Sequence, residues 1–249
     1  MIDIIIPHSA ADLSRNRNLF FVVKYLKKHL PNAKIIIVEQ NTETDITEVS
    51  GLVEEHLKIK TKESLFCKSL LLNEGYNVSQ SKYLIINDND CIIDFNMLRS
   101  IDTFYSVLDK HVILPYNKPV INLTENQTVE FINNSNAAFN YNSLNLIRRG
   151  WISQGGVVMI SSENYYNIGG HDPRFIGWGG EDDAFFFKSS QMLGIVRTSN
   201  DLIHMNHLRV GESQNPHYKE NLIYYREYLN KNNIINIVNN IGFSHLVKK

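Results

Sequence analysis

The chain has 249 residues, a length that suits one large α/β domain. Hydrophobic residues make up 43% of the chain and charged residues 20%, so a full-sized core is available and wholesale disorder is excluded. The formal net charge of -1, from 25 basic and 26 acidic residues, argues against a general nucleic-acid binder.

The first part of the chain alternates apolar runs with helix-like stretches. Residues 2–6 are predicted as a buried strand stopped by Pro7, and a helix capped by Ser14 is expected to run to about His29. Further along we expect strands at 34–38 and 83–86, a polar helix-like stretch around 45–57, and a helix at 65–76. Such alternation indicates βαβ units and a mainly parallel central sheet flanked by helices.

The second part is less regular. Residues 116–150, rich in asparagine, are expected to form long connections with little regular structure. We then expect a strand at 155–161, a short helix capped by Ser162, a glycine-rich loop at 169–180, a helix at 181–191, a strand at 203–206 and a helix at 218–229. Residues 232–247 form a mixed apolar segment. Because the sequence has no internal repeat or linker, it predicts one domain over 1–249.

Two acidic residues, Asp88 and Asp90, directly follow the predicted strand at 83–86. In a parallel sheet this position is the carboxyl end of a strand, where ligands bind. Carboxylates two residues apart on a turn can approach one hard cation, such as Mg²⁺ or Mn²⁺. An asparagine- and aspartate-rich turn without a metal is the alternative, and this spacing alone does not exclude it.

A more specific string, Gly-Trp-Gly-Gly-Glu-Asp-Asp, occupies 177–183. Its glycines allow close approach of the backbone to a ligand, and Trp178 offers a flat apolar face for a sugar ring. Its acids open a predicted helix, where one of them could accept a proton from a substrate hydroxyl. The alternative is an acidic helix start behind a glycine turn with a core tryptophan, but the length of the string favours the functional interpretation.

Two histidines, His204 and His207, are three residues apart. Such a pair is more often found on the surface or in the core than on a metal, yet here it follows a candidate aspartate site and could complete it. One aspartate with two histidines is also typical of non-haem iron centres. Those centres place the first histidine and the carboxylate close together in sequence, whereas Asp90 and His204 are far apart, so iron ranks low.

These strings resemble the β1,4-galactosyltransferases, glycosyltransferase family 7, in a bacterial or viral soluble form. The string at 177–183 is similar to the family signature, and the 66–76 segment to its Phe-Asn-Arg-Ala helix ending in Asn-x-Gly-Phe. Four further matches occur in the family's order: Ile5-Ile6-Pro7 with Arg15-Asn16-Arg17, Asp88-Asn89-Asp90, Gly155-Gly156-Val157, and His204 with His207. The resemblance covers residues 2–210, roughly four-fifths of the chain.

The resemblance implies an α/β chain with the GT-A nucleotide-sugar transferase fold and an inverting transfer from a UDP-sugar. It implies a nucleotide-binding part at 1–115, a catalytic and acceptor-binding part at 150–210 and a helical tail at 211–249. Asp182 would be the catalytic base, Glu181 would hold the donor or acceptor sugar, and Mn²⁺ would be bound by Asp90, His204 and His207. The nucleotide and donor would contact Pro7, Arg15, Arg17, Lys68, Asp88, Gly156 and Trp178, and the acceptor Trp178, Gly179, Gly180 and Asp183.

The sequence departs from the family pattern at several positions. Residues 8–14 resemble an insertion, which leaves the choice between Arg15 and Arg17 open, and Lys68 replaces an arginine. His204 replaces methionine, a softer ligand, so Mg²⁺ is an alternative to Mn²⁺. Ser153 stands where the family has a tyrosine that limits space at the donor sugar. The smaller residue predicts room for an N-acetyl group, and hence use of UDP-GalNAc as well as UDP-Gal, unless Gln154 or a residue of the 116–150 segment fills the gap.

We therefore expect a soluble glycosyltransferase acting on a glycan or lipid-linked glycan, with no nucleic-acid partner. The alternatives are one transferase module of the chondroitin-type capsule polymerases, and a sugar-binding homologue without catalysis. The cysteines, Cys67 and Cys91, form no disulfide framework, and no run of 18 apolar residues or signal peptide is evident. A cytoplasmic location is expected, with at most peripheral membrane contact through residues 234–249.

Overall fold

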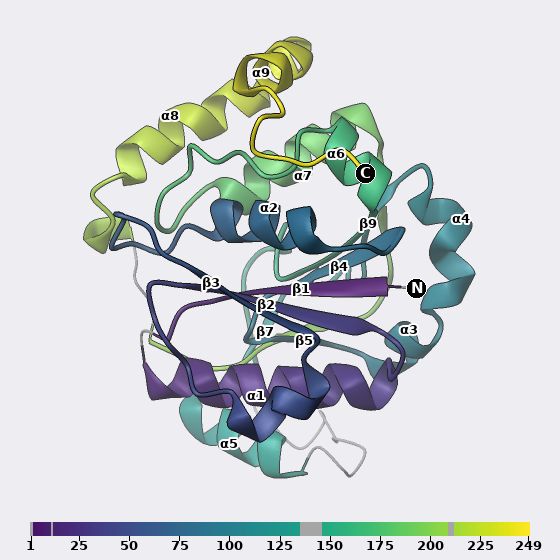
Figure 1. Cartoon of the computed structure of the whole chain (residues 1–249), viewed down its shortest axis with the longest axis vertical. Helices are drawn as coiled ribbons and strands as arrows, with labels where there is room; N and C mark the ends of the chain where they lie inside the picture. The colour runs from purple at the N-terminus through teal and green to yellow at the C-terminus, as the bar shows by residue number, and fades with distance from the viewer. Residues whose placement is uncertain (1, 11, 135–145, 209–211) are drawn as a thin grey trace.

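The computed structural model describes residues 2–10, 12–134, 146–208 and 212–249 (Figure 1). A seven-stranded sheet forms its centre, in the order β10-β6-β9-β4-β1-β2-β3. All neighbouring strands are parallel except where β9 pairs with β4 and β6, so the predicted mainly parallel sheet is confirmed. The strands are β1 (Ile2–His8), β2 (Lys34–Gln40), β3 (Glu55–Ile59), β4 (Tyr83–Asn87), β6 (Val112–Leu114), β9 (Val157–Ser161) and β10 (Ile195–Arg197).

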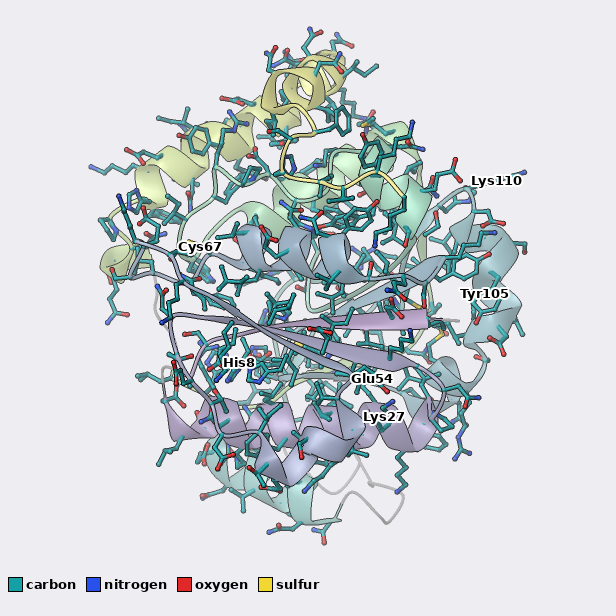
Figure 2. The ribbon with its side chains drawn as sticks, viewed as in Figure 1. His8, Lys27, Glu54, Cys67, Tyr105 and Lys110 are labelled. Atoms are coloured by element: carbon teal, nitrogen blue, oxygen red, sulfur yellow. The ribbon has the colours of Figure 1, made fainter. Side chains whose placement is uncertain are left out.

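Helices cover both faces of this sheet (Figure 1). Helix α1 (Leu13–His29) lies on one face, with α5 (Glu125–Asn134) beyond it, and α2 (Lys68–Val78) lies on the other. Lys27 of α1 forms an ion pair with Glu54 at 2.6 Å, and Glu54 also accepts a hydrogen bond from the Ile35 backbone, so α1 is tied to the sheet edge (Figure 2). The other helices are α3 (Phe95–Arg99), α4 (Tyr105–Leu108), α6 (Ser162–Asn167), α7 (Glu181–Met192), α8 (Tyr218–Leu229) and α9 (Ile234–Ile241).

A second, four-stranded sheet has the order β5-β11-β7-β8. It contains β5 (Cys91–Ile93), β7 (Ile121–Asn122), β8 (Ile147–Arg148) and β11 (Leu202–His204). Because β5 begins directly after Asp90, this small sheet continues from the carboxyl end of β4. Antiparallel pairing of β11 with β5 places His204 opposite Cys91. The sheet register therefore brings residues 204–207 to the turn that carries Asp88 and Asp90.

Several predicted boundaries are wrong in detail. Strand β1 continues through Pro7, because its last residues pair with β2 alone and the missing N–H of Pro7 interrupts no bond to β4. Asp12 caps α1, since its carboxylate accepts a hydrogen bond from the Arg15 backbone, and Ser14 instead donates to Asp12. Ser161, and not Ser162, caps α6.

Two longer predictions also need correction. The expected helix around 45–57 is a short 3-10 helix, Thr47–Leu52, followed by β3, which forms because its backbone pairs with β2 at the sheet edge. The expected irregular stretch 116–150 contains α5, β7 and β8; its residues 135–145 lie outside the described part. Helix α5 buries Thr128 and Phe131 against the body of the protein, which supplies the stability that its polar sequence does not suggest.

The C-terminal residues cross the end of α2. The Asn77 side chain donates to the His245 carbonyl at 3.1 Å and accepts from the Val247 backbone N–H at 2.9 Å. The Lys249 ammonium donates to the carbonyls of Tyr76 and Ser79. The Lys249 ammonium thus adds a charged donor at the C-terminal end of α2, where the helix dipole favours a cation. We call residues 245–249 the strap.

The tail helices pack on the rest of the chain. Ile234, Ile237 and Val238 of α9 are buried, whereas Ile235 is exposed. Among the described residues, no helix combines the length and apolar character needed to cross a bilayer. The division into a nucleotide-binding part, a catalytic part and a tail stays a prediction.

Helix α2 approaches the sheet closely through Gly75. A Cβ atom built there would lie 2.4 Å from Cγ2 of Ile5 and 3.1 Å from Cγ2 of Val38, both in fully buried side chains. Gly75→Ala is therefore expected to lower the free energy of unfolding by roughly 1–3 kcal/mol, measured by urea denaturation. Gly51→Ala is the matched control, because a Cβ at Gly51 has nothing within 4 Å. Equal stability of the two variants would contradict this close packing.

Candidate active site

The site is built around the turn that follows β4. The backbone N–H of Asp88 donates to the Gly156 carbonyl at 2.8 Å, and that of Cys91 donates to the Asp88 carbonyl at 3.1 Å. These bonds hold Asp88 and Asp90 on a tight turn between β4 and β5. The backbone N–H of Met205 donates to the Asp90 carbonyl at 2.8 Å, which fixes residues 204–207 beside the turn.

Lys68 lies between two carboxylates that are far apart in the sequence. Its ammonium is 2.8 Å from Oδ1 of Asp88 and 2.9 Å from Oδ1 of Asp182, and only 8% of its side chain is exposed. Burial alone would lower the pKa of Lys68, but Asp182 and Asp88 raise it well above its ordinary value. Lys68 is therefore a permanent cation that joins α2, the end of β4 and the start of α7.

Gly155 provides the space for the Asp182 carboxylate. A Cβ atom at Gly155 would lie 2.0 Å from Oδ2 of Asp182, so no other residue fits there without displacing the acid. Gly156 has φ +107°, and a Cβ there would meet Leu202 at 2.9 Å. Glycine is thus required at both positions, because Asp182 closely approaches Gly155 and Leu202 closely approaches Gly156. The pair allows the Asp88 turn and Asp182 to lie next to each other.

The negative charge of Asp182 disfavours ionisation of the neighbouring acids of this site. Burial, and next the charge of Asp182, raise the pKa of Glu181 to about 7, and the same causes raise the pKa of Asp183 to about 6. Burial also raises the pKa of Asp88 to about 7, with Lys68 opposing the shift. Near neutral pH, Glu181 is therefore partly protonated and can donate a hydrogen bond, which an ionised carboxylate cannot do.

Asp90, His204 and His207 come together as a candidate cation site. Nε2 of His207 lies 3.1 Å from Oδ2 of Asp90, and Nε2 of His204 lies 3.6 Å from Oδ1. One ligand atom from each of the three residues lies within 4.8 Å of the others. Although burial opposes it, His204 and His207 hold the pKa of Asp90 below its usual range, so its carboxylate is available as a ligand. One carboxylate with two imidazoles suits Mn²⁺.

Trp178 lies on a loop that packs against the start of α8. Its ring stacks on Tyr218 with 5.9 Å between ring centroids and 15° between planes, and 53% of the residue is exposed. The Asn215 side chain donates to the Trp178 carbonyl at 2.8 Å. A Cβ at Gly179 would lie 3.1 Å from the Tyr218 ring, so a glycine is needed for this packing. Trp178 therefore presents an open aromatic face beside Gly179 and Gly180, directly before the acids of α7.

The two candidate arginines have different surroundings. Arg17 forms an ion pair with Glu125 of α5 and donates to the Asn206 carbonyl at 3.3 Å. Arg15 donates to the Leu208 carbonyl at 3.2 Å, and its charge contributes to lowering the pKa of Asp90. Arg15 thus lies in the electrostatic field of the cation site, whereas Arg17 links α1 to α5. Pro7 is buried in β1 next to His8.

His8 is a site-supporting residue that the sequence did not single out (Figure 2). Its Nδ1 accepts a hydrogen bond from the Asn89 side chain at 2.6 Å, and its Nε2 lies 3.1 Å from both Asn16 and Thr44. Burial lowers the pKa of His8 to about 4, so the ring is neutral and Nε2–H is the donor. Because Asn89 separates the two aspartates, His8 anchors their turn to β1. The signal that the sequence offers is its place at the end of an apolar run, one residue after Pro7.

Ser153 lies at the other side of Gly155. Its hydroxyl accepts a hydrogen bond from the Gly155 backbone N–H at 3.3 Å, so the side chain folds back on its own backbone. The Gln154 side chain accepts instead from Arg197. Neither the Ser153 nor the Gln154 side chain therefore bonds to Asp182. This placement is relevant to the prediction that there is free space at the donor sugar beside Ser153.

Comparison with known proteins gives a family match over part of the chain. The model of the galactosyltransferase family described as "N-terminal domain of galactosyltransferase" matches residues 137–210. That span includes Gly155, Ser153, the 177–183 string and both histidines. The match confirms the predicted resemblance to the galactosyltransferases and, with it, the predicted enzyme class, a glycosyltransferase. No curated protein matches the chain in sequence.

Solved structures with a similar fold include two glycosyltransferases. The catalytic domain of Drosophila β1,4-galactosyltransferase 7, in complex with xylobiose, is 15% identical with a TM-score of 0.51, over 83% of this chain and 71% of that one. Residues 1–349 of S. aureus TarS, in complex with UDP-GlcNAc, are 12% identical with a TM-score of 0.59, over 98% of this chain and 73% of that one. The chain spans 44% of a longer TarS structure. These likenesses confirm the GT-A α/β fold.

The raised pKa of Glu181 predicts a pH-dependent cost to stability. The folded protein binds the Glu181 proton more tightly than the unfolded chain does, so this contribution to stability is present at low pH and is lost as the pH rises through about 7. Glu181→Gln cannot ionise and can still accept from the Gly179 backbone. The quantity to compare is the free energy of unfolding of Glu181→Gln minus that of the wild type. We expect this difference to be roughly 1–3 kcal/mol larger at pH 8 than at pH 5.

The control for this measurement is Glu163→Gln, at an exposed position of α6. Its stability relative to the wild type should not change over the same range. If the Glu181→Gln and wild-type curves run parallel from pH 5 to pH 8, the carboxyl is not held in the environment described here.

Proposed function

We propose that this protein is an inverting, metal-dependent glycosyltransferase that moves galactose or N-acetylgalactosamine from a UDP-sugar to a hydroxyl of a glycan acceptor. The observation that carries the proposal is the bridge of Lys68 between Asp88 and Asp182. It places the candidate base on α7 next to the aspartate turn that holds the candidate cation ligands. The chain therefore offers the parts of a single displacement reaction within one site.

The cation site would hold the diphosphate side of the donor. Asp90, His204 and His207 would be its protein ligands, with Mn²⁺ preferred and Mg²⁺ as the alternative ion. A divalent cation bound there would offset negative charge on the departing nucleotide. Arg15 adds positive charge on the same side, and Pro7, Arg17, Asp88 and Gly156 remain proposed neighbours of the nucleotide and donor.

Asp182 is the proposed base. It lies in the first turn of α7, where the helix dipole favours a carboxylate, and Lys68 holds a positive charge 2.9 Å from it. The Asp182 carboxylate would take the proton from the acceptor hydroxyl as that oxygen attacks the anomeric carbon. Lys68 is also within reach of Asp88, so it can remain bound there while Asp182 receives the proton. Glu181, partly protonated, would donate a hydrogen bond to a sugar hydroxyl.

The acceptor would lie against the Trp178 loop. The open face of the Trp178 ring can stack on a sugar ring; Gly179 and Gly180 follow it in the chain before the acids of α7, and Asp183 comes directly after the base. The xylobiose complex of the Drosophila enzyme supports an oligosaccharide acceptor, and the UDP-GlcNAc complex of TarS supports a UDP-sugar donor. A lipid-linked acceptor, a cytoplasmic location and peripheral membrane contact through the tail remain part of the proposal.

A donor screen tests the proposed function. Purified protein is incubated with UDP-Gal, UDP-GalNAc, UDP-Glc or UDP-GlcNAc, with and without Mn²⁺, and released UDP and transferred sugar are measured. Because Ser153 leaves space beside C2 of the sugar, we expect UDP-GalNAc to be used at least as well as UDP-Gal. Ser153→Tyr should restore a preference for UDP-Gal. Strict use of UDP-Gal by the wild type would contradict the role given to Ser153.

The cation site is tested by removing its ligands. Asp90→Ala and His207→Ala should each weaken Mn²⁺ binding by roughly 100-fold or more, measured by calorimetry, and abolish Mn²⁺-dependent transfer. His217→Ala, at the histidine directly before α8, is the matched control and should bind the ion normally. Transfer that continues unchanged in EDTA would show that no metal is needed.

The base is tested by Asp182→Asn, which keeps the shape of the side chain but cannot take a proton. We expect kcat to fall by roughly 100-fold or more while the Kd for UDP stays within about two-fold. Asp201→Asn, at a residue that pairs with Arg148 outside the site, should leave kcat unchanged. Near-normal turnover of Asp182→Asn would mean that another residue is the base.

A further inference from the structure

Arg197, the last residue of β10, holds the segment that forms one wall of the site. One guanidinium nitrogen donates to the Ser153 carbonyl at 3.2 Å and to the Gln154 side chain, and another donates to the Tyr116 carbonyl at 3.3 Å. The buried hydroxyl of Tyr116 then donates to the Gly155 carbonyl at 2.6 Å. Residues 153–155 are thus bound at three successive positions by one arginine and one tyrosine.

The same segment lies directly against the proposed base. Gly155 is the residue whose missing side chain leaves space for the Asp182 carboxylate, and Ser153 is the residue proposed to set space at the donor sugar. Any movement of this segment therefore changes the distance between the sugar-side wall and the base. Arg197 and Tyr116 are the side chains that oppose such movement.

Arg197 also contacts the helix that carries the base. Its guanidinium lies 5.3 Å from the centre of the Phe186 ring on α7 and 5.7 Å from the centre of the Tyr116 ring. Cation–π contact with both rings holds the guanidinium plane in place. Arg197 therefore touches both parts whose separation defines the width of the site, the 153–155 segment and α7.

We propose that Arg197, acting with Tyr116, is a positioning residue that sets the spacing between residues 153–155 and Asp182 and so determines which donor sugar is used. The proposal rests on the proposed function, because it concerns the donor side of the same site. Arg197 itself need not touch the substrate. It acts through the backbone of Ser153 and Gly155.

The test compares Arg197→Met, Arg197→Lys and Tyr116→Phe. For each variant kcat and KM are measured with UDP-Gal and UDP-GalNAc, together with the Kd for UDP and the thermal unfolding temperature. Arg197→Met keeps the apolar part of the side chain but removes the hydrogen bonds. We expect its kcat to fall roughly 10- to 100-fold, as for a misplaced reacting group, and the ratio of kcat/KM for the two donors to change. The Kd for UDP should stay within about two-fold.

The other variants make smaller changes to the same contacts. Arg197→Lys should recover part of the activity, because an ammonium keeps the charge but cannot reproduce the planar, forked donors. Tyr116→Phe removes only the bond to Gly155 and should change the donor ratio less, in the same direction. In the double variant with Arg197→Met the two effects should not multiply, since both residues hold one segment. Arg226→Met, on the exposed side of α8, is the control and should match the wild type.

Two results would overturn the proposal. One is an unchanged donor ratio in Arg197→Met with only a lower unfolding temperature, which would indicate a purely structural role. The other is a crystal structure of Arg197→Met in which residues 153–155 keep their place against Asp182. The crystal structure does not depend on activity, whereas a wild type that transfers neither sugar would refute the proposed function itself.

Discussion

Two partly buried carboxylates from distant parts of the chain lie together because one ammonium lies between them. Asp88 ends the β4 strand and Asp182 begins α7, and without Lys68 their charges would repel each other in a region with little water to screen them. Lys68 is itself poorly placed as the first residue of α2, since a cation at a helix N-terminus opposes the helix dipole. The two acids compensate for that position. The Lys68 ammonium therefore links α2, the end of β4 and the start of α7. Its positive charge stabilises the carboxylate on each of the other two elements, and both carboxylates stabilise the ammonium.

This coupling explains why glycines gather around the site. The Asp182 carboxylate that pairs with Lys68 occupies space that a side chain at Gly155 would fill, and the Asp88 turn is held by the carbonyl of Gly156. Burial and the charge of Asp182 raise the pKa values of Glu181 and Asp183, and burial also raises that of Asp88 although Lys68 opposes the shift. A site for binding and proton transfer is thus kept at some cost to the stability of the fold, as is common in enzymes.

Much of the fold could be predicted from the sequence because its central strands are runs of isoleucine, leucine and valine that read as buried. Helix α5 was missed because its sequence is polar, although Thr124 and Gln127 form reciprocal hydrogen bonds as a capping box, a signal present in the sequence. The metal and base candidates could be grouped because they follow strands or open a helix. The Lys68 bridge and the His8 contact could not, since they depend on side-chain distances between separate elements.

The strap has a consequence for how the protein is made. Asn77 and Val247, which bond to each other, are 170 residues apart, so a ribosome adding about 5–20 residues per second needs roughly 10–30 s to synthesise the chain between them. Through that interval the carbonyls of Tyr76 and Ser79 lack the Lys249 ammonium, and the helix that carries Lys68 is less firmly held than in the finished protein. The ion bridge at the other end of α2 must likewise wait for Asp182 to emerge. Synthesis from the N-terminus thus delays the completion of the site until most of the chain has left the ribosome.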